Sequence, residues 1–390
     1  MAEANDCFAV EYTRRTRMAP GKSAHCLTTM PKFVSALQIT SAVFSLLFAS
    51  CLVEGETNDR LVSGSSAGEI MASRSKAHHL SDDDTISDLL NHPAFAGFSR
   101  LLLPWDDRAY DDAMGLRNVG SLLPYHSHVN PGTVVSALNH MIDDVNNGKT
   151  VFYEFYTGEE RKAQQTKSNT GLFFFRGRPG APFAVISPGG GFSYVGSLHE
   201  GFPYAVAISK RGYNAFVLRY RAGSGGAVAT QDLAAAISYV FRNAKVLDVG
   251  IQGYSLWGSS AGARMAAAIG SHGVASFGGD ALPKPSTVVM AYTGHSEYSA
   301  NEPSTFVVVG EHDGIAPPSV MERRVAALRK AVQTWSFIDI AVSVMASVPA
   351  LVPARKDGLT ALFDFGRRPS DQVLSASWIA ECNRRCQPGS

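Results

Sequence analysis

Residues 253–262 read GYSLWGSSAG, and this stretch decides the fold. Its first half ends an apolar strand candidate, and its second half is a Gly-x-Ser-x-Gly run centred on Ser260. Such a run places a serine on a sharp strand-to-helix turn with its hydroxyl exposed. Small neighbours are required because a side chain at Gly258 or Gly262 would strike nearby backbone. We therefore predict that Ser260 is a nucleophile, with a glycine-serine helix cap as the alternative.

A second glycine-rich stretch, SPGGGF at 187–192, directly follows an apolar run. Glycines let the backbone approach a substrate, and rigid N–H groups stabilise the negative charge that develops on a carbonyl oxygen. The candidate oxyanion donors are Gly190 or Gly191 together with Ala261, the residue after the serine. A phosphate-binding loop is the alternative, but the chain contains neither GxxxxGK[ST] nor GxGxxG.

A late strand candidate at 305–309 leads into the loop GEHDGIAP at 310–317. An acid in this position orients the histidine of a Ser-His-Asp triad. Asp313 is the preferred candidate and Glu311 is the second. The alternative is that Asp313 only forms an Asp-Gly turn.

Apolar strand candidates alternate with helix candidates over most of the chain. This alternation predicts an α/β fold with a mostly parallel central sheet and helices on both faces. The strand candidates are 151–156, 172–175, 183–187, 214–220, 253–257, 287–292 and 305–309, and the helix candidates are 133–145, 204–210, 230–243 and 261–269.

Residues 150–330 resemble a bacterial group of α/β-hydrolases that includes acetyl esterases, dienelactone hydrolases and feruloyl-esterase-like proteins. The likeness rests on PGGG at 188–191, the Gly-x-Ser-x-Gly run and DGIAP at 313–317. It implies that Ser260 and Asp313 belong to a triad that hydrolyses small carboxylic esters, including acyl groups on carbohydrates, without a metal or cofactor. Pro188 replaces the histidine of the HGGG subgroup, which argues against a lipase-like assignment.

The resemblance also implies a triad histidine in a Gly-His-Gly-Phe setting after the acid, yet no histidine follows His312. Codons for 332–366 can be chosen so that a shifted frame encodes a strand, that histidine loop and a terminal helix in order. We therefore predict that 331–390 is an out-of-frame tail, that the last strand and helix are lost, and that activity is low or absent. The alternative is a divergent C-terminus whose base is His199, His295 or His312.

The chain divides into four parts. Residues 1–51 are predicted to be a leader, 52–150 a linker and helical segment, 151–330 the hydrolase domain, and 331–390 the aberrant tail. Basic residues precede a stretch without charge from 33 to 53, which is typical of an export signal. The stretch ends in LFASC at 47–51 and so resembles a lipobox, with Cys51 as the acylated residue; a retained membrane anchor is the alternative.

Composition limits the partners. The 35 basic and 34 acidic residues leave no case for nucleic acid, and no zinc spacing occurs. We expect a small-molecule ester as substrate, membrane attachment through a lipid on Cys51, and export to the periplasm, the membrane or the medium. Two function classes stay open: a serine esterase and a non-catalytic hydrolase-fold binding scaffold or lipoprotein. A related peptidase ranks lower because no propeller-like repeat precedes the domain.

Overall fold

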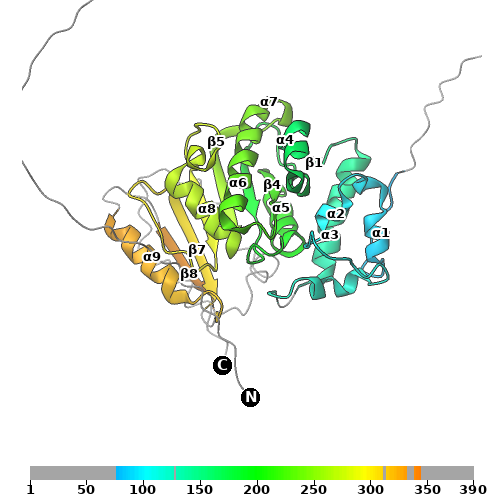
Figure 1. Ribbon diagram of the computed structural model, residues 1–390, viewed down its shortest axis with the longest axis horizontal. Coiled ribbons are helices and arrows are strands. Elements are labelled where there is room, and N and C mark those ends of the chain that lie inside the picture. Colours follow the sequence, from blue (N-terminus) through cyan, green and yellow to red (C-terminus); the bar gives the residue numbers. More distant parts are fainter. Residues whose placement is uncertain (1–75, 127–128, 311–312, 332–337, 344–390) are drawn as a thin grey trace, which may run out of the picture. The chain divides into compact units, whose positions relative to one another are not determined.

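The computed structural model of the chain describes residues 76–126, 129–310, 313–331 and 338–343 (Figure 1). All of them belong to one compact unit, Ala72–Ser390. The predicted leader with its Cys51, the linker up to residue 75 and the tail beyond residue 343 lie outside the described residues. Among the helices that are described, none is long and apolar enough to cross a bilayer.

An eight-stranded sheet forms the centre of this unit, with the strand order β1-β2-β4-β3-β5-β6-β7-β8. β2 is antiparallel to β1 and β4, and every other pair is parallel. The carboxyl ends of the parallel strands meet at one edge, where ligand sites form in such sheets. The strands are Phe152–Tyr153, Gly171–Phe175, Pro182–Ser187, Asn214–Arg219, Gly250–Ser259, Thr287–Ala291, Ser304–Gly310 and Ile338–Ser343.

Both faces of the central strands are apolar, and successive side chains belong to two different cores. In β2, Leu172 and Phe174 join one cluster, whereas Phe173 and Phe175 join the other. β3 and β4 alternate in the same way. Because neighbouring side chains along a strand point to opposite faces, the sheet needs helices on both sides to cover it.

Helices α6, α8 and α9 contribute to the first core, and α3 and α5 contribute to the second. Most helix candidates were predicted to within a few residues of their observed ends. The helices are Ile86–Leu90 (α1), Ser99–Leu102 (α2), Pro131–Asn146 (α3), Gly158–Ala163 (α4), Phe202–Ser209 (α5), Gly225–Arg242 (α6), Ala244–Leu247 (α7), Ala261–His272 (α8) and Pro318–Ala331 (α9).

The described part of the N-terminal segment, residues 76–150, shares the second core with the sheet. Its main helix α3 begins at a strong signal, because the Asn130 side chain accepts the N–H of Thr133 (3.0 Å) and Pro131 occupies the first turn. The segment is also tied to the sheet by charge. Arg219 at the end of β4 is fully buried and binds the carboxylate of Asp106.

One expectation about the sheet is wrong. The last strand is not lost, because Ile338–Ser343 forms β8, which pairs with β7 from Thr305↔Ile338 to Gly310↔Ser343. Without this strand β7 would be the edge and would present a row of unpaired backbone groups. The sequence of β8 is rich in β-branched residues, which favour strands. The predicted loss of the helix that should follow concerns residues outside the described part.

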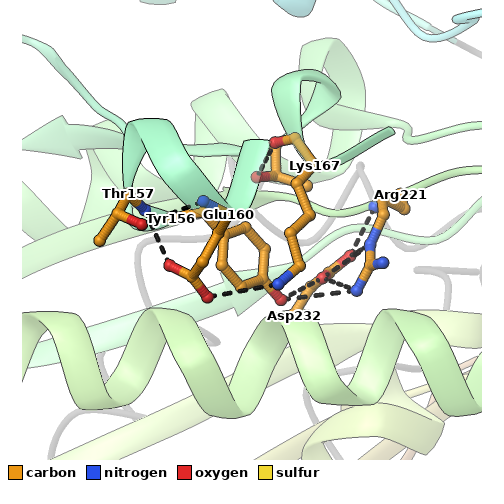
Figure 2. A network of polar contacts seen from close by, with 7 residues as sticks. Tyr156, Thr157, Glu160, Lys167, Arg221 and Asp232 are labelled. Atoms are coloured by element: carbon orange, nitrogen blue, oxygen red, sulfur yellow. Dashed lines mark hydrogen bonds and ion pairs between the residues drawn. The ribbon is translucent and has the colours of Figure 1, made fainter. Parts of the chain in front are cut away.

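A buried ion pair joins the end of β4 to helix α6 (Figure 2). The Asp232 carboxylate accepts the backbone N–H of Arg221 (2.8 Å), its guanidinium Nη2 (2.6 Å) and the hydroxyl of Tyr156 (2.7 Å). Burial, followed by the charge of Asp232, raises the pKa of Tyr156, so the phenol remains a donor at neutral pH. Lys167 lies over the Tyr156 ring at 4.1 Å and extends the network to α4 through Glu160.

Asp232→Asn is expected to lower the free energy of unfolding by about 3 kcal/mol, because it leaves the buried Arg221 guanidinium without an opposite charge. Urea unfolding measures this. The matched control is Asp280→Asn, which breaks the exposed Arg242–Asp280 pair (3.6 Å) and is expected to cost less than about 1 kcal/mol. Equal losses in the two variants would contradict the prediction.

Candidate active site

Ser260 occupies the turn between β5 and α8, and its backbone is strained. Its φ of 50° and ψ of −113° lie in a region that glycine favours. Its N–H donates to the carbonyl of Ala291 at the end of β6 (2.9 Å), which fixes the turn against the neighbouring strand. The serine therefore lies at the carboxyl edge of the parallel sheet.

Two glycines make this turn sterically possible. A Cβ added at Gly258 would overlap the backbone of Gly262, and one added at Gly262 would overlap the carbonyl of Ser187 at the end of β3. Helix α8 can approach the sheet this closely only because both positions lack a side chain. This is the steric requirement that the sequence motif predicted.

The strand order and the strained serine after β5 together decide the identity of the fold. The chain has the α/β-hydrolase fold. The predicted fold class, a mostly parallel sheet with helices on both faces, is confirmed.

Known proteins of this fold resemble the chain only distantly. No protein-family model and no curated protein matches it. An acetyl ester-xyloside bifunctional hydrolase from Caldicellulosiruptor lactoaceticus is similar over 60% of this chain and 96% of its own, with 17% identity and a TM-score of 0.45. An α/β-hydrolase enzyme from a Medee basin deep-sea metagenome library is similar over 54% of this chain and 92% of its own, with 22% identity and a TM-score of 0.40. A lipase/esterase from Lactobacillus plantarum is similar over 50% of this chain and 93% of its own, with 20% identity and a TM-score of 0.42.

The glycine loop after β3 lies against the serine. A Cβ added at Gly189 would be 3.1 Å from the Cβ of Ser260. The loop then turns tightly, with φ of 129° at Gly190 and 61° at Gly191. The carbonyl of Gly190 accepts the N–H of Tyr194 (3.2 Å), which closes the turn.

A cavity of about 350 Å³ opens beside Ser260. Three of the residues predicted for the site line it together: the serine, Ala261 and Gly191. Gly190 precedes Gly191 but does not line the cavity. The full set is Gly191, Phe192, Ser260, Ala261, Arg264, Thr293, Gly294, His295, Ser296 and Glu297.

Asp313 lies in the loop between β7 and α9 and is not among the residues that line the cavity. Its carboxylate accepts the N–H groups of Ile315 and Ala316, both at 2.8 Å. This is the Asp-Gly turn that the sequence offered as the alternative. The role of Asp313 as triad acid stays a prediction, and Glu311 and His312 lie outside the described residues.

The other two candidate histidines differ in position. His199 is buried beside His126, with ring centroids 5.2 Å apart, and does not line the cavity. His295, in the loop after β6, does line it. Burial is the main cause that lowers the pKa of each ring to about 4, so both are neutral at neutral pH.

The aromatic residues near the loop have three different surroundings. Phe192 lines the cavity. Tyr194 is fully buried beneath the loop. Tyr125 is 61% exposed, and its ring lies 3.3 Å from where a Cβ of Gly191 would be. Only Phe192 therefore contacts the space that a substrate would occupy.

Sequence reasoning did not identify Arg264 and Glu297 as site residues. Arg264 follows Ser260 by four positions on α8, a spacing that puts two helical residues on one side of the helix. That spacing was a usable signal. No sequence signal pointed to Glu297, because it lies in the irregular loop after β6, whose path depends on tertiary packing.

Ser260→Gly is expected to be more stable than Ser260→Ala by about 1 kcal/mol in urea unfolding. A Cβ in this strained conformation costs about 1–3 kcal/mol, and glycine removes it. The control is Ser136 in the middle of α3, where the order should reverse and glycine should be about 1 kcal/mol less stable than alanine. The same order at both positions would contradict strain at Ser260.

Proposed function

We propose that the protein is a serine hydrolase that cleaves small carboxylic esters. The observation that carries this proposal is the strained Ser260, which opens onto a cavity that it shares with Gly191 and Ala261. A nucleophile and two backbone N–H groups around one cavity are the parts that acyl transfer requires.

The reaction follows from this arrangement. The Ser260 oxygen attacks the ester carbonyl, and the negative charge that develops on the carbonyl oxygen is stabilised by the N–H groups of Ala261 and the glycine loop. Ala261 begins α8, so its N–H has no partner within the helix. Collapse of the intermediate releases the alcohol, and water then releases the acid from the acyl-serine.

The cavity supports a small, polar substrate. Arg264, Thr293, His295, Ser296 and Glu297 surround the serine, whereas Phe192 and Ala261 are its only apolar side chains among the described residues. A long acyl chain would leave these polar groups without hydrogen-bond partners. A short acyl group on a polar alcohol, such as a carbohydrate, would satisfy them.

The proposed reaction also needs a general base that accepts the proton of Ser260, and the expected histidine is missing. No histidine follows His312 in this chain, and we propose that 331–390 is translated out of frame. Resequencing the coding DNA across codons 325–350 tests this: a single inserted or missing base restores the histidine loop and with it full activity. An unchanged sequence means that the organism encodes this tail, so that the triad histidine is truly missing. The chain as written should then be a poor catalyst.

A fluorophosphonate probe should label the protein, and the label should map to Ser260 by peptide mass spectrometry. Ser260→Ala is expected to abolish labelling, because the nucleophilic oxygen is gone. The matched control is Ser259→Ala, which removes the neighbouring buried hydroxyl and should leave labelling in place. Absence of any label on the wild type would favour the non-catalytic binding scaffold.

His295 is expected to accept the proton in residual hydrolysis of p-nitrophenyl acetate. Its pKa of about 4 means that the neutral ring, which can accept a proton, forms as pH rises through about 4. The rate should therefore rise through that pH and stay level up to pH 8, and His295→Gln should lower it at least about 10-fold. His199→Gln, a buried histidine outside the cavity, is the control. An unchanged rate in His295→Gln would remove His295 from the mechanism.

A further inference from the structure

Gly189, the first residue of the glycine loop, is held on both sides. Its N–H donates to Oε2 of Glu200 (2.7 Å), and its carbonyl accepts the N–H of Gly196 (2.9 Å). A hydrogen-bonded N–H cannot also serve a substrate oxygen. Gly189 is therefore excluded as an oxyanion donor, which leaves the next two amides of the loop.

Glu200 is fully buried, and its second oxygen lies at ion-pair distance from a histidine. Its Oε1 lies 2.8 Å from Nε2 of His126, whose side chain is only 6% exposed. The other ring nitrogen of His126, Nδ1, lies 2.8 Å from the hydroxyl of Tyr194.

These contacts attach both ends of the loop to one pair of side chains. Glu200 holds Gly189, where the loop begins, and His126 holds Tyr194, whose N–H closes the turn at Gly190. Within the described part of the chain, no carbonyl accepts the N–H of Gly190 or Gly191. The anchored ends thus leave the central amides unpaired.

The position of Glu200 gives the pair an electrostatic role. A Cβ added at Gly189 would be 2.7 Å from Oε2 of Glu200 on one side and 3.1 Å from Cβ of Ser260 on the other. A buried carboxylate this close to the serine would oppose the negative charge that develops in acyl transfer. The hydrogen bond from the Gly189 N–H and the ion-pair contact with the His126 ring offset this charge.

We propose that Glu200 and His126 are a positioning pair that holds the ends of the glycine loop, so that the amides of Gly190 and Gly191 stay free and Gly191 borders the cavity of Ser260. The inference rests on the proposed serine hydrolase function. It assigns neither residue a contact with substrate.

The test combines two measurements on the full chain: hydrogen exchange at the Gly189 amide, and the rate of fluorophosphonate labelling at Ser260. Glu200→Ala should speed exchange at Gly189 at least 10-fold and slow labelling at least about 10-fold, a part of the roughly 100-fold that losing one oxyanion donor costs. Glu200→Gln keeps an oxygen for the Gly189 N–H and should rescue exchange more than labelling.

Glu302→Gln is the matched control. Glu302 is another buried carboxylate, paired with Arg324 (3.3 Å) and bonded by the Ser271 hydroxyl, and it does not line the cavity. This variant should lose stability in thermal unfolding yet keep wild-type exchange at Gly189 and wild-type labelling. If it slows labelling as much as Glu200→Ala does, the effect reflects stability and the proposal is overturned.

The remaining outcomes are also decisive. If Glu200→Ala keeps the wild-type rates of exchange at Gly189 and of labelling at Ser260, the proposed positioning role is overturned. If Glu200→Ala does not fold, His126→Gln takes its place, with the same expected slowing of labelling. If the wild type itself is not labelled, the proposed function fails, and faster exchange at Gly189 in Glu200→Ala but not in Glu302→Gln still supports the positioning role.

Discussion

The structure depends on one close approach of backbone to backbone. Helix α8 reaches the sheet at Gly262, which faces the carbonyl of Ser187, while Gly258 faces Gly262. This contact forces the chain to reverse direction within one residue, and Ser260 carries the resulting strain. The same contact brings the end of β3 beside the serine, so the glycine loop and Ser260 become neighbours. Steric exclusion by missing side chains is thus the origin of the site.

Residues at and just after the end of β4 connect the parts of the molecule that surround this contact. Three consecutive residues hold three different parts of the molecule: Arg219 binds Asp106 of the N-terminal segment, the Tyr220 hydroxyl donates to the carbonyl of Pro188 (3.0 Å), and Arg221 pairs with α6. All three are buried. Because buried charges and buried polar groups are costly unless they are paired, each of these contacts constrains the geometry as well as joining the elements.

Patterns of short range could be predicted because their cause is local. The period of two in strands and the small residues around Ser260 are visible in the chain itself, and strands β1 to β7 appear where they were expected. β8 was missed because the tail was interpreted by its lack of a histidine. β8 forms because its β-branched sequence favours a strand and because it pairs with the edge that β7 would otherwise leave open.

The fold class and the position of the strained serine could be read from the chain alone, since both follow from local sterics and apolar alternation. Only the tertiary structure decided which polar groups share the cavity, and why Glu200 and His126 meet although 74 positions separate them. It also placed His295 and Ser260 on the same cavity and left Asp313 in a turn. Such meetings depend on how helices pack on the sheet, and no local pattern in the chain encodes them.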